Sequence, residues 1–251
     1  MNKIIQYSTI LTALLTAAGC ASTRTRKPSL NASAWYGFGD NLSLDESRFD
    51  NSPSQSHGID EGLKGFKLGV EYPIEVKGKK MNLGLKYIHG EAEEDTTQTS
   101  TATGGLEGTA TFNASANVNA GEVYVQGRKK FKRVMLDGKV GVFVANADGE
   151  MSGQGYVSSS DGRFAVGQYF HTSADGVIAG ASLGGRASIP IGSDLEVFVG
   201  AQYNAGTEAE FDPADTRVQV MGRTGTAKAL NSPGSVNMNG LSGEVGIKAT
   251  F

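Results

Sequence analysis

The chain has 251 residues, with 35 glycines and only 6 prolines, and its mean hydropathy is −0.24. The 23 basic and 26 acidic residues nearly cancel, which argues against a nucleic-acid partner, and the single cysteine excludes an internal disulfide. Beyond the N-terminal segment no run of about 18 apolar residues occurs, so the sequence offers no further candidate for a membrane-spanning helix.

The N-terminal segment has the pattern of a secretory signal peptide. A positive charge is followed by an apolar stretch over residues 4–18, which is too short to cross a bilayer comfortably. Small residues then lead to Cys20, an arrangement that resembles a bacterial lipobox, although Ala17 stands where leucine is usual. We therefore expect a signal peptide over residues 1–19 and a lipid, with palmitate among its acyl chains, on Cys20. The alternative is ordinary cleavage after Ala21.

A short polar and basic stretch, residues 20–28, separates this cysteine from the rest of the chain. Fully extended, such a tether reaches about 30 Å, which is enough to join a lipid in the inner leaflet to a nearby barrel rim. Alanine rather than aspartate follows Cys20, which resembles the pattern in lipoproteins that are transferred to the outer membrane. The sequence thus predicts a lipid-anchored N-terminus on the periplasmic side of a bacterial outer membrane.

The final segment, residues 241–251, shows the clearest alternation between two faces. One face is apolar or small and the other is polar, as expected for a β-strand between two different environments. The first face consists of Leu241, Gly243, Val245, Ile247, Ala249 and Phe251. Such a strand ending in phenylalanine resembles the signal that barrel-assembly machinery recognises in outer-membrane barrels. Phe251 is therefore expected to be needed for assembly.

The same period of two recurs in seven earlier segments, each of which is predicted to be a strand. They cover about residues 30–38, 66–74, 81–87, 112–126, 134–144, 179–189 and 195–203. In the fourth of these segments, the apolar residues change from even to odd positions near Gly121. An extra residue in one strand would cause such a change, so a β-bulge is predicted there.

The connections between these strands alternate between short and long. Short connections are expected near residues 75–80, 129–133 and 192–194, and long ones near 40–62, 91–112, 148–172 and 206–236. This is the layout of transmembrane barrels, with short periplasmic turns and longer outer loops. The predicted fold is all-β: an eight-stranded antiparallel up-and-down transmembrane barrel over residues 29–251, with a polar interior and long extracellular loops.

The interior of an eight-stranded barrel is just wide enough to be filled by side chains. The polar face of the predicted strands carries five basic and five acidic residues, which we expect to pair inside the barrel and to oppose an open pore. They are Lys67, Glu71, Lys86, Glu122, Asp137, Lys139, Arg186, Glu196, Glu244 and Lys248. Outside the strands, the short turns are rich in lysine and arginine, whereas the long loops carry most carboxylates. Solvation explains those carboxylates more simply than divalent cations that bridge lipopolysaccharide.

Residues 29–251 as a whole resemble the small outer-membrane barrels of the OmpA and OmpX type in hairpin layout, final strand and paired interior charges. The resemblance implies contacts with outer-membrane lipid and lipopolysaccharide. Members of this class act as tethers, adhesins, small pores or lipid-modifying enzymes, so the fold does not decide the function. Lipidation at Cys20 and the length of the loops depart from the usual pattern. No spacing of metal ligands appears, and neither a metal nor a cofactor is expected.

Two alternative functions follow from particular residues. His171 and Ser173 weakly resemble the His-x-Ser of lipid A deacylases, for which Glu208 or Glu210 would have to supply the carboxylate. A soluble lipocalin-like lipoprotein is the second alternative, but Trp35 lacks the Gly-x-Trp context of that family.

The remaining histidines, His57 and His89, are isolated in the sequence. Aromatic residues near strand ends are expected to form interface girdles. These are Trp35, Tyr36, Tyr72, Tyr87, Tyr203 and Phe251.

The most specific expectation about function is a non-enzymatic, surface-exposed barrel that supports the envelope or presents its loops to an extracellular partner. Residues 91–112 are acidic and rich in threonine and glycine, so they are predicted to lie on the cell surface. The even-numbered apolar run from Phe112 to Val118 suggests that the fourth strand continues beyond the membrane as a protruding sheet.

Overall fold

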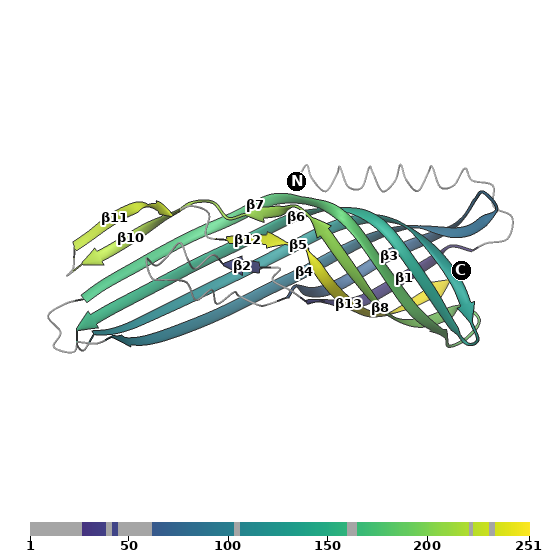
Figure 1. The fold of residues 1–251 in the computed structure, drawn as a ribbon, viewed down its shortest axis with the longest axis horizontal. Helices are drawn as coiled ribbons and strands as arrows, with labels where there is room; N and C mark the ends of the chain where they lie inside the picture. Colours follow the sequence, from purple (N-terminus) through teal and green to yellow (C-terminus); the bar gives the residue numbers. More distant parts are fainter. Residues whose placement is uncertain are drawn as a thin grey trace.

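The computed structural model describes residues 27–38, 42–44, 62–102, 106–159, 165–220, 223–230 and 234–251. Their strands, drawn in Figure 1, are β1 (Ser29–Phe38), β2 (Leu42–Leu44), β3 (Lys64–Val76), β4 (Lys79–Ala102), β5 (Leu106–Phe131), β6 (Val134–Ser159), β7 (Ala165–Pro190), β8 (Leu195–Gly206), β9 (Glu208–Glu210), β10 (Ala214–Val220), β11 (Arg223–Leu230), β12 (Gly234–Asn237) and β13 (Gly240–Thr250). In these ranges no helix is both long and apolar enough to span a membrane, a finding that says nothing about strands.

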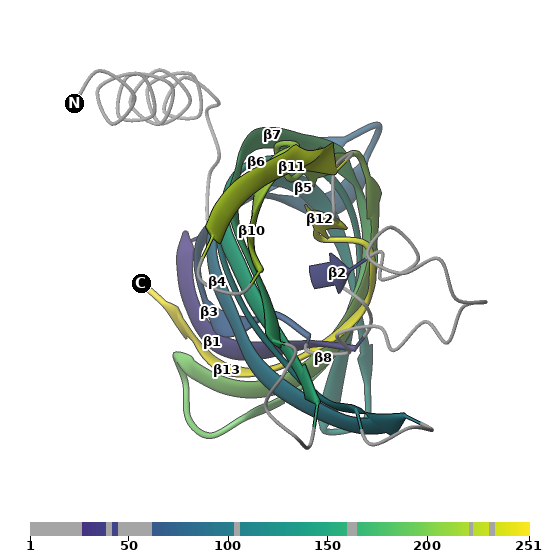
Figure 2. The same cartoon turned by 90° about the vertical axis from the view of Figure 1, so that its left-hand side faces the viewer.

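Eight of these strands close into an antiparallel ring. The order around the ring is β1, β3, β4, β5, β6, β7, β8 and β13, and β13 returns to pair with β1. Figure 2, which looks along the long axis, shows the strands around a central space. Closure leaves no unpaired edge within the ring. The predicted all-β barrel of eight antiparallel strands is confirmed.

The three short connections lie where the sequence predicted them, all at one end of the ring. Lys77 and Gly78 join β3 to β4, and both have positive φ angles, of 50° and 75°. A two-residue turn with this backbone matches the twist of the strands it joins, and glycine adopts it without a steric penalty. Lys132 and Arg133 join β5 to β6, and residues 191–194 join β7 to β8.

The prediction of long loops at residues 91–112 and 148–172 was wrong, because both stretches are mostly strand. The hairpins β4–β5 and β6–β7 continue far beyond the ring and form the elongated left half of Figure 1. Their polar sequence suggested loops because it lacks the alternating apolar residues that mark the exterior of the ring strands. Threonine is nevertheless well suited to strands, and the hydroxyls of Thr97 and Thr111 lie 3.4 Å apart across β4 and β5.

The connection at residues 206–236 also contains strands. β10 pairs with the outer end of β7, and β11 pairs with β10, which widens the extended sheet. β9 and β12 pair with each other, and β12 also pairs with β2, so that they form a separate three-stranded sheet. We call the part of β4–β7 beyond the ring, together with β10 and β11, the outer sheet. Most of the predicted loop 40–62 lies outside the described residues.

The predicted β-bulge near Gly121 is absent, because β5 pairs in unbroken register with β4 and with β6 along its length. The change of parity has another cause. Even-numbered residues of β5 point inward throughout, but they change from polar, as at Glu122, to apolar, as at Val118. At this level the inward side of the strand changes from polar to apolar and the outward side from apolar to polar, while the backbone remains regular.

The interior accordingly has two layers. Inside the ring lie buried charged and polar side chains, and the outer sheet covers an apolar cluster. The small sheet of β2, β9 and β12 lies against the inner side of β6 and β7 within the outline of the barrel (Figure 2). Ala209 of β9 and Val236 of β12 belong to the apolar cluster, together with Phe211. Glycines make room for them: a methyl group at Gly149 would lie 3.1 Å from the Phe211 ring, and one at Gly176 would lie 2.7 Å from Ala209.

Candidate functional site

The ring interior holds all ten charged residues that the sequence placed there. Nine are buried, and the side chain of the tenth, Glu196, retains 14% of its exposure. Ions removed from water need partners of opposite charge and well-placed hydrogen bonds. Three groups of contacts supply them, at successive depths of the ring.

The first group surrounds Glu71 of β3. Arg186 donates a hydrogen bond of 2.5 Å to Glu71, and Lys248 contacts the other carboxylate oxygen. The hydroxyl of Tyr124 and the amide of Asn31 also donate to this carboxylate, at 3.0 and 3.2 Å. Glu71 thereby connects strands on opposite sides of the ring.

The second group lies nearer the outer sheet. Lys67 Nζ donates to Glu244 at 3.1 Å, and Lys86 Nζ lies 3.4 Å from Glu122 and 3.9 Å from Glu244. Lys139 Nζ lies 3.8 Å from Glu122 and also donates to a glutamine of β8. Three lysines thus surround two carboxylates, which fills this level of the barrel with charge.

The third group contains Arg128, which the sequence analysis missed. Its guanidinium donates to both oxygens of Asp137, at 2.7 and 2.9 Å, and to both oxygens of Glu196, at 2.7 and 3.0 Å. Such paired contacts suit the planar guanidinium. Arg128 has the same parity on β5 as Glu122, and this signal could have placed it inside. Its closeness to the turn at Lys132 made it resemble part of the basic turn.

Aromatic rings pack against the interior cations. Lys86 and Lys139 lie 5.1 and 5.4 Å from the ring centre of Tyr124, and Lys67 lies 5.1 Å from that of Trp35. The prediction that Trp35 belongs to an interface girdle was wrong, because its odd position on β1 directs it inward and leaves it 6% exposed. Its indole N–H donates to the backbone carbonyl of His89 at 3.0 Å.

The exterior of the ring carries a band of exposed apolar side chains. Its members include Leu68, Tyr87, Val123, Val140, Val142, Val144, Leu183, Val199, Val245 and Ile247. The band ends at one level on adjacent strands. Tyr87, Gly121 and Val144 lie in register, and the next exterior positions are His89, Asn119 and Asn146. From this level outward, most of the exterior positions on these strands are polar.

His89 is isolated in sequence but not in space. Its Nδ1 lies 3.0 Å from Asn119 Oδ1, its Nε2 lies 2.9 Å from Glu91 Oε1, and its ring centre lies 5.1 Å from that of Phe66. The hydroxyl of Tyr87 donates to the same Asn119 oxygen at 2.6 Å. Hydrogen bonding to Asn119 and then to Glu91 raises the pKa of the His89 imidazole above its usual value. These residues form a polar rim directly above the apolar band.

His171 and Ser173 are exposed on the exterior of the outer sheet, beyond this rim. Glu150 lies opposite Ser173 in the register, but no hydrogen bond links these three side chains in the described structure. Glu208 and Glu210 belong to β9, and Glu208 accepts a hydrogen bond from Ser235 at 2.8 Å. The arrangement does not assemble a nucleophile, base and orienting carboxylate.

Cys20 and His57 lie outside the described residues. Among the described residues, no group of three or more His, Cys, Asp or Glu side chains is placed to hold a metal ion.

No family model and no curated protein sequence matches this chain. Solved structures with a similar fold include Ail, the attachment invasion locus protein of Yersinia pestis, with 10% identity over 91% of this chain and 100% of that chain, and a TM-score of 0.34. A major outer membrane protein from Thermus thermophilus has 13% identity over 89% and 99% of the two chains, with a TM-score of 0.41. The outer membrane protease OmpT of Escherichia coli has 12% identity over 92% and 99%, with a TM-score of 0.32. These similarities concern the fold alone.

Proposed function

We propose that this chain is an outer-membrane barrel lipoprotein with a structural or surface-interaction role. The observation that carries the proposal is the exterior apolar band, which ends at the same level on β4, β5 and β6. An exposed apolar surface of this extent is unfavourable in water but suits the lipid-facing side of a barrel. The ring strands β1, β13 and β8 have 10, 11 and 12 residues. Tilted strands of about 9–11 residues cross a bilayer.

The orientation follows from the two ends of the ring. The turns Lys77–Gly78 and Lys132–Arg133 lie at the end where β1 begins and β13 finishes. We assign this end to the periplasm, where a lipid on Cys20 would enter the inner leaflet and where barrel-assembly machinery would meet Phe251. The outer sheet then projects from the cell, and the polar rim around His89 lies at the level of lipopolysaccharide.

The interior favours a role that depends on the outer surface. Ion pairs fill the ring, and the small inner sheet with its apolar cluster fills the space beyond it. Neither layer resembles the apolar ligand cavity of a lipocalin. The exposed outer sheet offers strand edges and side chains to an extracellular partner, a recurring mode of protein recognition. Among the described residues, His171, Ser173 and Glu208 are not organised into a catalytic group that would support the deacylase alternative.

The test is the location of the two ends in whole cells. An epitope tag inserted at Gly104, between β4 and β5, should bind antibody on intact cells. The same tag inserted between Lys77 and Gly78 should bind only after permeabilisation. The reverse result would invert the topology and remove the basis for a surface role. Lipid A with an unchanged acyl pattern in cells with and without the protein would support the non-enzymatic assignment, whereas loss of one acyl chain only in its presence would contradict it.

A further inference from the structure

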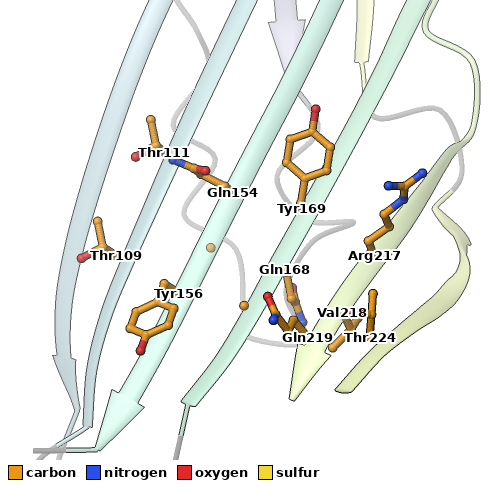
Figure 3. Close-up of a pocket in the computed structure, with 12 residues that line it drawn as sticks. Thr109, Thr111, Gln154, Tyr156, Gln168, Tyr169, Arg217, Val218, Gln219 and Thr224 are labelled. Carbon is orange, nitrogen blue, oxygen red and sulfur yellow. The ribbon is translucent and has the colours of Figure 1, made fainter. Parts of the chain in front are cut away.

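A groove of about 460 Å³ crosses the outer sheet near its far end, over β5, β6, β7, β10 and β11 (Figure 3). Tyrosine, glutamine, threonine, arginine and glycine line most of it. The groove lies well beyond the apolar band and shares no residue with the ionic networks of the ring. It is therefore a separate feature of the surface.

The register of the sheet places its main side chains on one face in two adjacent rows. The first row contains Thr111, Gln154, Tyr169 and Arg217, and the second contains Thr109, Tyr156, Gly167, Gln219 and Thr224. This is the same face as that of His171, opposite to the apolar cluster. The groove thus opens away from the barrel interior.

Two tyrosine rings stand up from this face, and one glycine, Gly167, lies beside them. Tyr156 of β6 and Tyr169 of β7 are 54% and 47% exposed, and Figure 3 shows them among the residues that line the groove. Gly167 lies opposite Tyr156 in the register, and a methyl group at Gly167 would meet its nearest atoms only at 4.0 Å. The surface beside the rings is therefore open down to the backbone at this position.

Three polar side chains in the groove are available for hydrogen bonds to a ligand. Within the described residues, the amides of Gln154 and Gln219 and the guanidinium of Arg217 have no hydrogen-bond or ion-pair partner. The interior arginines differ, because Arg128 and Arg186 are both held by carboxylates. Amides can donate to and accept from hydroxyl groups, while a free guanidinium can hold a carboxylate through paired hydrogen bonds.

We propose that this groove binds an oligosaccharide that carries one carboxylate-bearing sugar. The C–H face of a pyranose ring is apolar and weakly positive, so it packs on the negative face of a tyrosine ring, and its hydroxyls would meet Gln154 and Gln219. Arg217 would hold the carboxylate. A long polyanion is disfavoured, because the rows of the same face nearer the membrane carry Asp95, Glu150 and other carboxylates. The proposal takes the surface exposure of the outer sheet from the proposed function, but binding itself can be measured without cells.

The experiment uses the full chain refolded in detergent micelles and a glycan array with neutral, carboxylated and polysulfated members. Carboxylated oligosaccharides should be retained in preference to their neutral counterparts. Tyr156→Ala and Tyr169→Ala should each weaken binding at least about tenfold, whereas Tyr169→Phe, which keeps the ring, should bind nearly as well as wild type. Arg217→Gln should remove the preference for the carboxylate and retain binding of the neutral sugar. Val157→Ala, next to Tyr156 but on the opposite face of β6, is the matched control and should have no effect.

Three results would overturn the proposal: retention of no glycan by the wild type, equal binding by the tyrosine variants, or a preference for polysulfated chains that Arg217→Gln leaves intact. Heat-dependent electrophoretic mobility must first show that each variant is folded. A reversed topology in the epitope-tag experiment would contradict the proposed function, but it would leave glycan binding in micelles unchanged, so the two failures can be told apart.

Discussion

Tyr124 of β5 lies directly against Gly84, the residue opposite to it on β4. A methyl group on Gly84 would lie only 2.1 Å from the Tyr124 ring. The glycine therefore creates the space that lets the tyrosine cross the interior and donate a hydrogen bond to Glu71 at 3.0 Å. Because the ring is packed by Lys86 and Lys139, it has little freedom to move away.

From this contact we predict that Gly84→Ala lowers the free energy of unfolding by about 1–3 kcal/mol, the usual cost of overpacking a filled interior. Gly121→Ala is the matched control: it lies on the neighbouring strand, faces outward and has no atom within 4 Å of the added methyl, so we expect a change within about 0.5 kcal/mol. Urea titration of the refolded protein in micelles measures both. Equal stability of the two variants would show that Tyr124 is not held in this position.

A second prediction concerns Arg128, which holds Asp137 and Glu196 together. Replacement by leucine leaves two carboxylates close together without their cation. We expect a loss of about 2 kcal/mol, less than for a fully buried pair because the Arg128 side chain remains 27% exposed. Lys129→Leu removes the same charge at an exposed neighbouring position and should be nearly neutral. The midpoint of urea unfolding distinguishes the two, and similar midpoints would contradict the structural role of Arg128.

The fold of the ring could be predicted because apolar residues, which face outward, alternate there with polar residues, which face inward. The same rule placed Glu71 and Arg186 inside. It could not show that they contact each other, because they are 115 residues apart and meet only when the barrel closes. It also missed Arg128, whose position near a basic turn concealed its inward parity.

The outer sheet could be predicted only in part. The even-numbered apolar run from Phe112 to Val118 correctly indicated that the fourth strand continues beyond the ring, but the reversed environment concealed the other strands. Beyond the exterior apolar band, the inward positions of β5 become apolar at Val118, and the exterior becomes polar at Asn119. That reversal resembled a bulge, and the polar exterior resembled a loop. The groove around Tyr156 and Tyr169 was missed for the same reason, since it depends on the pairing of strands that the sequence did not identify.

A third prediction concerns the anchor. The lipobox-like sequence predicts that Cys20 carries the lipid, so metabolic labelling with a palmitate analogue should mark the wild type, while Cys20→Ser should lose the label. Ser22→Ala, close by in the same tether, is the control and should be labelled normally. Label retained by Cys20→Ser would contradict lipidation at this residue and would favour cleavage after Ala21.

The last prediction is that the barrel does not conduct ions in a planar bilayer. An ion entering from the turn end meets the pairs of Arg128 with Asp137 and Glu196, and then the groups around Glu71 and Glu122. Beyond these it meets the apolar cluster under the inner sheet, where Phe211 packs close to the backbone of Gly149. An eight-stranded ring leaves no room for a wide path around these side chains.

Salt should not open this path. Buried ion pairs are screened much less than exposed ones, so the current recording should show no conductance steps between about 0.1 M and about 1 M potassium chloride. A sixteen-stranded porin in the same bilayer provides the positive control, because barrels of that size contain an aqueous channel. Stable current steps that grow with salt concentration would show that the two layers do not seal the barrel. The two layers are chemically different, one ionic and one apolar. Phe211→Ala should therefore not conduct ions as long as the ion pairs remain. Conduction by that variant alone would show that the apolar layer is the one that blocks ions.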